Sequence, residues 1–448
     1  MKIAVLGAGG MRLPLLYQAL LARIQRLRLD RLALMDVDGE KLELMLGVAR
    51  AMAQTPSGLD VEATTVLEAA LDGASYVITT FRVGDMPGRV LDERIPLSHG
   101  LLGQETTGAG GFAMAMRTLP VLHHVIERMR RSCPQAWLLN FANPSGLLAE
   151  AARRAGWERS LGICDAPSAM LHLAARLLDV PAGEVYLDYF GLNHLGWVRR
   201  VLHRGEDYLP TFLSMIRAAG GFPGLPFEPD LLLELRMIPN EYLKYYYYAR
   251  QTVEALRVAR QTRGEFLLEL SDQARRELAG LLERGDTRAA VERYRAYLRR
   301  RGETYLDGSA EPAAPPPDPQ AGDGGYADVA LDVIEALSGG GERVLILNAP
   351  SQGAVDGMAP EDVVEVPVLV RANGLQPMAV GSIPDHALGL MLRVKAVERL
   401  TIEAAAEGSR SKALLALALH PLVADASQAR LLLAEMERAH ASTFPSLQ

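Results

Sequence analysis

The chain has 448 residues, 49% of them hydrophobic and 23% charged, which is typical of a globular protein of two or three domains with a large core. Its net charge of −7, without a basic stripe or tail, excludes nucleic acid as an expected partner. The chain has only two cysteines, and no secretory signal or long uninterrupted apolar run is visible in it. We therefore expect a cytoplasmic protein with no membrane span.

Short apolar segments alternate with helical segments over the first part of the chain. The predicted strands cover residues 2–6, 31–35, 75–80, 137–140 and 160–164, and the predicted helices cover 14–24, 41–53 and 114–129. This alternation predicts an α/β fold with a parallel sheet and helices on both faces. We therefore expect a Rossmann domain over residues 1–168.

The pattern changes after residue 168. Strands of a different sheet are predicted over 185–189 and 196–202, followed by a helical region over 242–282. The Pro-, Ala- and Gly-rich residues 309–325 are predicted to form a mobile surface loop. Further strands are predicted over 344–348 and 363–370, and closing helices over 386–407 and 412–419. These elements predict a mixed α/β domain over residues 169–448. The site should lie between the two domains, at the carboxyl ends of the strands.

A glycine turn follows the first predicted strand. Gly7, Gly9 and Gly10 allow a tight turn, and the helix that begins after them presents free N–H groups and a positive dipole end to a pyrophosphate. Asp36, at the end of the second strand, can accept hydrogen bonds from a ribose and would repel a 2′-phosphate, which favours NAD over NADP. Arg12 stands where the usual pattern has Gly or Ala, and the alternative is a turn without a ligand.

Polar clusters stand where strands or helices are expected to end. They cover residues 81–84, 92–96, 103–108, 140–144, 162–165, 191–194 and 239–242. Within them, Cys164 and His194 are candidate metal ligands that would leave coordination positions open for substrate oxygens and water. The alternatives are a small buried hydrophobe and a structural histidine. Cys133 has no partner nearby and is interpreted as structural.

Three further groups of residues have two interpretations each. Tyr242 begins an aromatic run that reads as a packed helix face, and a tyrosine acts as a base only where a nearby cation lowers its pKa. Asp165 is either an acid or a partner of the Cys164 ligand. Arg82 and Asn143 either bind the hydroxyls or a phosphate of a ligand, or serve as caps at strand ends.

Five motifs resemble those of glycoside hydrolase family 4, the NAD- and metal-dependent glycosidases. They are DERIPLSHGLLGQETTGAGGFAMAMRTLP (92–120), NFANPSG (140–146), GICDAPS (162–168), GLNHLGW (191–197) and NEYLKYY (240–246), within a resemblance that runs from residue 2 to about 420. It implies a second domain like that of lactate and malate dehydrogenases, and a homodimer or homotetramer.

The resemblance implies an unusual reaction, because this family is an exception to the two-carboxylate rule of glycosidases. The C3 hydroxyl of the sugar is oxidised to a ketone with NAD, a divalent metal, usually manganese, polarises the forming enolate, and a tyrosinate removes the C2 proton. The glycosidic oxygen then leaves, water adds at C1, and NADH returns the hydride to C3. The NAD is thus reduced and reoxidised within each cycle, and the overall reaction is hydrolysis.

The family's functional residues match positions of this sequence. The resemblance implies that Cys164 and His194 hold the metal and that Tyr242 is the base. Asp165 matches the general acid of the 6-phospho-α-glucosidases. Arg82 and Asn143 match substrate contacts, and Arg263 matches a further basic substrate contact.

Three departures from the family bear on the substrate. The usual GGGSxxTP turn is GAGGMRLP here, and we hypothesise that Arg12 pairs with an anion. Asp165 is typical of 6-phospho-α-glucosidases, but the 92–120 block, the chain length and the stretch 348–367 favour a 6-phospho-β-glucosidase. Residues 322–326 lack an expected arginine, which leaves an unphosphorylated glycoside as an alternative. The rival classes are an NAD-dependent hydroxy-acid dehydrogenase and a catalytically silent sensor.

Overall fold

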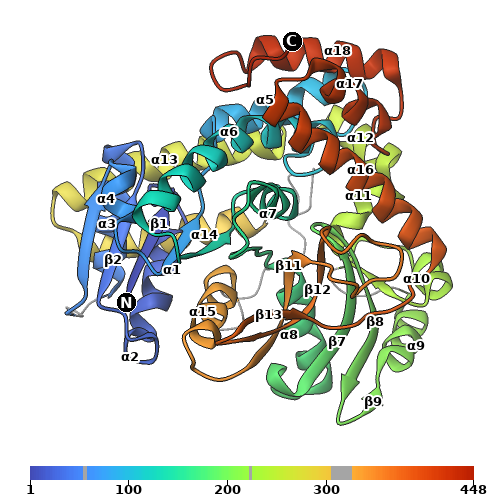
Figure 1. The fold of residues 1–448 in the computed structure, drawn as a ribbon, viewed down its shortest axis with the longest axis horizontal. Helices are drawn as coiled ribbons and strands as arrows, with labels where there is room; N and C mark the ends of the chain where they lie inside the picture. The colour runs from blue at the N-terminus through green and yellow to red at the C-terminus, as the bar shows by residue number, and fades with distance from the viewer. Residues whose placement is uncertain (54–57, 221–224, 304–324) are drawn as a thin grey trace.

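The structure is a computed structural model that describes residues 1–53, 58–220, 225–303 and 325–448 (Figure 1). Its main sheet has nine strands in the order β13-β12-β11-β6-β5-β4-β1-β2-β3. The six parallel strands are β1 (Lys2–Leu6), β2 (Arg31–Met35), β3 (Asp60–Thr64), β4 (Tyr76–Thr79), β5 (Trp137–Asn140) and β6 (Ser160–Gly162). Their order, 3-2-1-4-5-6, defines a Rossmann sheet, so the predicted N-terminal fold is confirmed.

Three strands from the C-terminal part of the chain extend this sheet beyond β6. They are β11 (Arg343–Pro350), β12 (Val363–Arg371) and β13 (Gly374–Pro377), and all pair antiparallel. Asn348 of β11 pairs with Gly162 of β6. The sheet therefore crosses residue 168, where the sequence predicts a domain boundary. The loop predicted over 309–325 lies, except for its last residue, outside the described residues.

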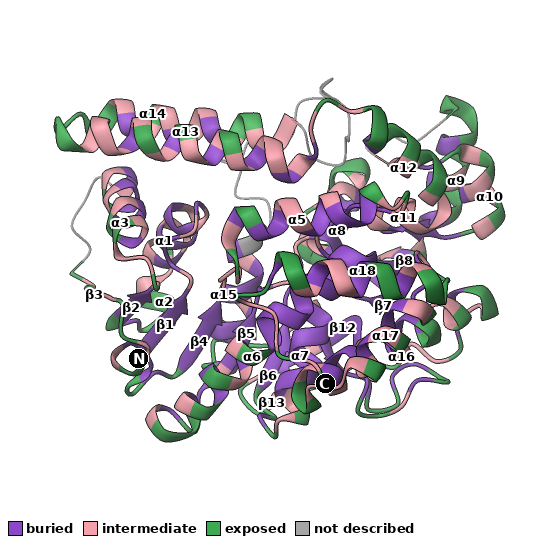
Figure 2. Ribbon diagram, turned by 90° about the horizontal axis from the view of Figure 1, so that it is seen from above, coloured by how far each residue is buried: buried purple, intermediate pink, exposed green. Residues whose placement is uncertain are grey.

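Helices cover both faces of the parallel strands. Alternate residues of β1 point to opposite faces: Ile3 and Val5 belong to one hydrophobic core, and Ala4 and Leu6 to another. The helices α1 (Leu13–Ala22), α2 (Ile24–Leu27) and α3 (Gly39–Ala53) pack into the first core, whereas α4 (Leu67–Leu71), α6 (Gly108–Ser132) and α7 (Ser145–Arg154) pack into the second. The buried central strands are visible in Figure 2.

A second sheet follows the Rossmann strands. It contains β7 (Val185–Leu192), β8 (Leu195–His203), β9 (Glu206–Asp207) and β10 (Ile238–Pro239). The helical elements around it are α8 (Ala166–Leu178), η1 (Ala182–Glu184), α9 (Leu209–Ala219), α10 (Pro229–Leu235) and η2 (Glu241–Leu243). With α15 (Tyr326–Leu337), they make the mixed α/β C-terminal part that the sequence predicts.

The prediction of one continuous helical region over 242–282 is wrong, because the region is divided into four helical elements. It consists of η2, α11 (Lys244–Tyr247), α12 (Ala249–Val258) and α13 (Arg263–Glu283). A capping box starts α13, because the Thr262 hydroxyl accepts from Glu265 N–H while the Glu265 side chain accepts from Thr262 N–H. This break sets Arg263 at the start of a new helix. With α14 (Thr287–Glu303), α13 packs beside α3 (Figure 2).

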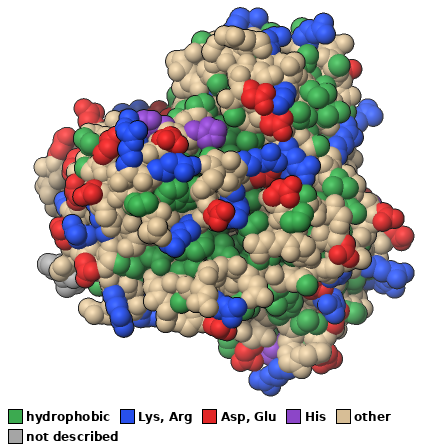
Figure 3. Space-filling view, in the orientation of Figure 1, with side chains coloured by type: hydrophobic (Ala, Val, Ile, Leu, Met, Phe, Trp, Pro, Cys, Tyr) green, Lys and Arg blue, Asp and Glu red, His purple; other side chains and the backbone are tan. Residues whose placement is uncertain are grey.

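The polar cluster 92–96 was expected at the end of a strand or helix, and that expectation is wrong. It lies inside α5 (Asp85–Ser98), where Asp92 forms a fully buried ion pair with Arg117 of α6 at 2.5 Å. The closing helices are α16 (Asp385–Glu407), α17 (Arg410–Leu419) and α18 (Ala426–Ala439). Acidic and basic side chains are interspersed over the face in Figure 3.

None of the helices in the described ranges is both long and apolar enough for a membrane span.

Candidate functional site

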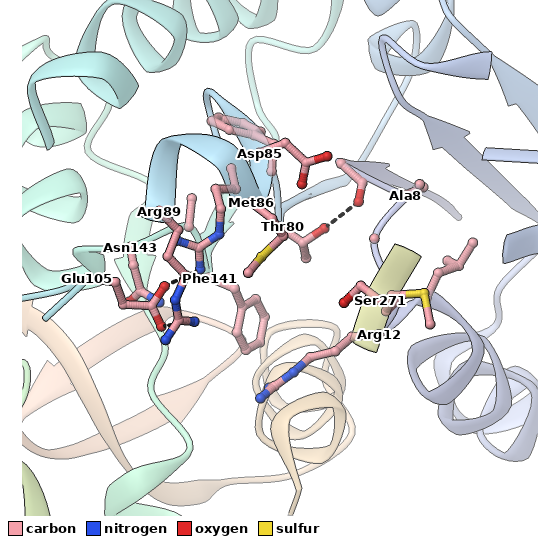
Figure 4. A pocket seen from close by; sticks show the side chains of 18 of the residues that line it. Ala8, Arg12, Thr80, Asp85, Met86, Arg89, Glu105, Phe141, Asn143 and Ser271 are labelled. Atoms are coloured by element: carbon pink, nitrogen blue, oxygen red, sulfur yellow. Dashed lines mark hydrogen bonds and ion pairs between the residues drawn. The ribbon is translucent and has the colours of Figure 1, made fainter. Parts of the chain in front are cut away.

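A pocket of about 450 Å³ lies at the carboxyl ends of the parallel strands. Its walls come from the segments after β1, β2, β4, β5 and β6, together with η2, α13 and α14. The structure brings all the predicted site residues together here: Gly7, Gly9, Gly10, Asp36, Arg82, Asn143, Cys164, Asp165, His194, Tyr242 and Arg263. Figure 4 shows part of the pocket, with Glu105 and Arg89 close together and Arg12 reaching in from the side of the glycine turn. Its volume is that of a small-molecule site.

The dinucleotide turn, residues 7–14, is shaped by its backbone. Gly7 has a φ of +94°, and a Cβ there would lie 2.4 Å from the Phe81 nitrogen, so only glycine fits. The Gly9 N–H donates to Asp36 Oδ2 at 2.8 Å, and the Asp38 N–H donates to Asp36 Oδ1 at 3.1 Å. These bonds hold the Asp36 carboxylate against the turn, at the edge of the pocket.

Arg12 connects the dinucleotide turn with the other half of the pocket. Its Nη1 lies 3.5 Å from Asp165 Oδ2, and both side chains are about two-fifths exposed, at 42% and 41%. An ion pair this exposed is weak, because water screens it. This pair alone therefore contributes little to holding Arg12 in place.

Cys164 follows β6 and stands two residues before α8. Burial raises the pKa of its thiol well above the usual value, and the negative charges of Glu365 and Asp165 act in the same direction. Its environment is thus buried and negatively charged. A cation would reverse this effect and favour the thiolate, which is the form that binds metals.

His194 lies in the turn between β7 and β8. Its φ of +63° is left-handed, which is unusual for a residue other than glycine. The Nδ1 atom lies 2.8 Å from Thr106 Oγ1, and the ring stacks on Tyr242 with centroids 3.7 Å apart and planes 10° from parallel. Burial lowers the pKa of His194 to about 4, so the imidazole is neutral near pH 7 and able to bind a metal.

Tyr242 is the tyrosine of the aromatic run that lines the pocket. Asn240 fixes its backbone, because Asn240 Oδ1 accepts from the Tyr242 N–H at 3.0 Å. Further along the run, Tyr246 bonds Thr107 Oγ1 at 2.8 Å and Tyr247 accepts from Trp197 Nε1 at 3.1 Å. These two tyrosines are packing residues. We call Cys164, His194, Tyr242 and Thr106 the histidine corner.

A chain of alternating charges lies beside the histidine corner. Glu105 pairs with Arg82 at 2.5 Å and with Arg89 at 2.7 Å, and Arg89 Nε also donates to Glu93 at 2.8 Å. Burial alone would raise the pKa of Glu105, but the two arginines lower it to about 2. Sequence reasoning assigned no role to Arg89 or Glu105, although the i, i+4 spacing of Arg89 and Glu93 on a helix was a usable signal.

Cys164 and His194 fit a divalent cation. A thiolate and a neutral imidazole are suitable donors for a borderline metal, and two protein ligands leave positions open for a substrate. Within the described ranges, no cluster of three or more His, Cys, Asp or Glu residues could hold a metal ion. A cation held by Cys164 and His194 alone would keep open coordination positions, as a catalytic metal does.

The fold and pocket define a dinucleotide-binding α/β protein whose cofactor turn opens onto a polar site of metal-ligating type. Residues 2–180 match the family model "Family 4 glycosyl hydrolase", and residues 189–423 match "Family 4 glycosyl hydrolase C-terminal domain". The chain belongs to family 4 of the glycosyl hydrolases. The resemblance drawn from the five motifs is thereby confirmed.

Members of both anomeric types are similar to the chain. A 6-phospho-beta-glucosidase of Escherichia coli is 30% identical, with 100% of this chain and 96% of that protein covered. The structure of 6-phospho-beta glucosidase from Thermotoga maritima with manganese, NAD+ and glucose-6-phosphate has a TM-score of 0.84 at 28% identity, over 100% of both chains. A 6-phospho-alpha-glucosidase from gut microorganisms, with NAD and Mn2+, has a TM-score of 0.86 at 28% identity, over 100% of this chain and 99% of that one.

Proposed function

We propose that the protein hydrolyses 6-phospho-β-glucosides with NAD and a divalent metal, most favourably Mn2+. The observation that carries this proposal is that the dinucleotide turn and the histidine corner line one pocket. The similar structures that hold NAD and manganese support the same cofactors here. We propose that Gly7, Gly9, Gly10 and Asp36 bind the NAD and that Cys164 and His194 bind the metal.

The chain's own residues orient the sugar and move protons. When bound, NAD and the metal supply a reversible two-electron oxidant for the sugar C3 hydroxyl and positive charge for the resulting carbonyl. Tyr242 takes the proton at C2, which the neighbouring carbonyl has made acidic. Its ring stacks on the neutral His194, and the charge of a cation bound to that imidazole would favour the tyrosinate. Asp165 gives a proton to the leaving glycosidic oxygen. Water then adds its hydroxyl to C1 while Tyr242 returns a proton to C2, and restoration of the C3 hydroxyl completes hydrolysis.

We assign Arg82, Asn143 and Arg263 to the sugar phosphate substrate. All three residues line the pocket, and Arg82 forms an ion pair with Glu105. The glucose-6-phosphate in the similar Thermotoga structure supports a phosphorylated sugar. We favour a β-glucoside as substrate because residues 92–120 and 348–367 resemble the 6-phospho-β-glucosidases of the family. Asp165 keeps a 6-phospho-α-glucosidase as the second candidate, which the similar α-type structure also supports.

The proposal is tested by an assay with two substrates, a nitrophenyl 6-phospho-α-glucoside and the corresponding β-glucoside. Each is measured with and without NAD and Mn2+. We expect cleavage of the β-glucoside that requires both cofactors and accumulates no NADH. Cleavage of the α-glucoside alone would select the second candidate. Steady NADH production on a hydroxy acid, without cleavage of either glucoside, would replace glycosidase with dehydrogenase.

We also propose a homodimer or homotetramer in the cytoplasm, with a functional division of the chain near residue 168. Light scattering on the purified protein gives the subunit number. A monomer at micromolar concentration would contradict the first part of this proposal.

A further inference from the structure

The loop of residues 103–107 carries Thr106 of the histidine corner and is packed tightly against α6. Two glycines of α6 allow its close approach: a Cβ on Gly110 would lie 2.2 Å from the Gln104 carbonyl oxygen, and a Cβ on Gly111 would lie 2.5 Å from the Thr106 carbonyl carbon. Gln104 and Thr106 are both 9% exposed. The loop therefore presents its side chains from a fixed backbone.

The hydrogen bonds around Gln104 determine how its amide is turned. The backbone N–H groups of Thr106 and Thr107 donate to Gln104 Oε1 at 2.6 and 2.8 Å. An amide turned the other way would set its NH2 group against two donors. The atom that faces the loop is therefore the oxygen, an acceptor.

The Thr106 hydroxyl has a single proton to donate. Its Oγ1 lies 3.0 Å from Gln104 Oε1, which can only accept, so the proton points to Gln104. The same Oγ1 lies 2.8 Å from His194 Nδ1, and a hydroxyl that donates to Gln104 accepts from an Nδ1–H. This arrangement of donors and acceptors matches a His194 that carries its proton on Nδ1. No hydrogen bond reaches Nε2 from the described part of the chain, and His194 lines the pocket.

We propose that Gln104 and Thr106 are positioning residues that hold His194 as the Nδ1–H tautomer, which leaves the Nε2 lone pair for a divalent cation. The inference rests on the metal site of the proposed function. It adds a role for two residues that the proposed function assigns to neither the cation nor the sugar. A hydrogen-bond partner behind a metal-binding histidine fixes the tautomer and the ring orientation and raises the basicity of the ligand.

The neighbouring turn makes this support necessary. His194 has a left-handed backbone with a φ of +63°, a strained conformation that persists only where the surroundings hold it. Asn193 Oδ1 accepts from the Ser145 N–H at 3.0 Å, Thr106 holds the imidazole, and Tyr242 covers one of its faces. Loss of the Thr106 bond frees the ring to change tautomer, whereas the turn stays anchored through Asn193.

Three variants at adjacent positions test the inference by Mn2+ titration of the metal-stripped protein, read by electron paramagnetic resonance. Thr106→Val keeps the side-chain shape but removes the acceptor, and we expect the dissociation constant for Mn2+ to rise about 10- to 100-fold. Thr106→Ser retains the hydroxyl and should restore affinity to within about threefold. Thr107→Val is the matched control, because its hydroxyl bonds Tyr246 instead, and it should leave the affinity unchanged.

A spectrum of the 15N-histidine-labelled, metal-free protein reads the tautomer without any variant. We expect Nδ1 protonated in the wild-type protein and a shift toward Nε2–H in Thr106→Val. A wild-type His194 protonated on Nε2, or a Thr106→Val variant with wild-type Mn2+ affinity, would overturn the inference. A wild-type protein that binds no Mn2+ would instead overturn the metal site of the proposed function, and the spectrum would still decide the tautomer.

Discussion

The dinucleotide turn and the histidine corner lie in one pocket but are built differently. The turn is backbone, made within a few residues and closed by a bond from Gly9 to Asp36. The corner is made of side chains from segments far apart in the sequence, three of them buried, joined by a bond between His194 and Thr106 and by the stacked Tyr242 ring. Glycine geometry sets the shape of the turn, whereas burial and neighbouring charges set the chemistry of the corner. Substitutions at the turn should therefore affect folding and NAD binding, whereas substitutions at the corner should affect metal binding and reaction rate.

Tyr242→Phe should have the largest effect. It keeps the stacking on His194 and removes the hydroxyl that takes the C2 proton, so kcat should fall about 10²- to 10⁴-fold. KM for the glucoside and affinity for Mn2+ should stay within about threefold of wild type, as steady-state kinetics and metal titration can show. The matched change Tyr247→Phe removes a hydroxyl bonded to Trp197 and should leave kcat nearly unchanged. Equal kcat values for the two variants would remove the distinction between corner and packing tyrosines.

Glu105→Gln tests the charges beside the corner. The pKa of Glu105 is lowered to about 2 from an unfolded value of 4.5 because Arg82 and Arg89 outweigh burial. The stabilisation is complete above about pH 4.5 and is lost as the pH falls toward 2, by about 3 kcal/mol in all. Urea unfolding between pH 6 and 3 should show a shallower pH dependence for the variant. Parallel curves would mean that Glu105 does not contribute to acid stability.

Gly7→Ala tests the backbone nature of the turn. The new Cβ would lie 2.4 Å from the Phe81 nitrogen at a left-handed φ, so the free energy of unfolding should fall by about 2 kcal/mol. Gly10→Ala is the control, because its Cβ would lie 3.3 Å from the Gly7 oxygen and no left-handed φ is involved. Chemical denaturation should separate the two variants. Equal stabilities would contradict a turn held by backbone geometry.

Arg12→Ala should have the smallest effect. The exposed pair with Asp165 contributes little to stability, so unfolding should change by less than about 1 kcal/mol. If the arginine pairs with an anion, affinity for NAD or for the phosphorylated sugar should fall about two- to fivefold, as measured by fluorescence titration and KM. Unchanged affinity for both would refute the hypothesis.

The sequence predicts the turn well, since its signals are local. The apolar run of β1, the glycines and Asp36 lie within 35 residues of one another, and β1 and β2 occur at the predicted bounds. At the corner, residue type and position make Cys164 and His194 candidate metal ligands, and only the family resemblance connects them with Tyr242. No spacing rule connects Cys164, His194 and Tyr242, because packing between β6, the β7–β8 turn and η2 brings them together.

Two failures of prediction have different origins. The capping box of Thr262 and Glu265 is a local signal, and it interrupts the region predicted as one helix. The polar cluster 92–96 lies inside α5, where Asp92 pairs with Arg117 of α6, a contact that no local pattern predicts. The addition of β11–β13 to the Rossmann sheet is likewise a long-range event, since Asn348 pairs with Gly162 across almost half the chain.

Hydrolysis of a 6-phospho-β-glucoside in D2O, with the product examined by NMR, tests the central claim most directly. If Tyr242 removes and later returns a proton at C2, the glucose 6-phosphate should carry one deuterium at C2 and keep hydrogen at C3, with no net NADH. Tyr242→Phe should slow cleavage and deuterium incorporation together. Rapid hydrolysis without deuterium at C2 would contradict the account, because the glycosidic bond would then break without proton removal at that carbon.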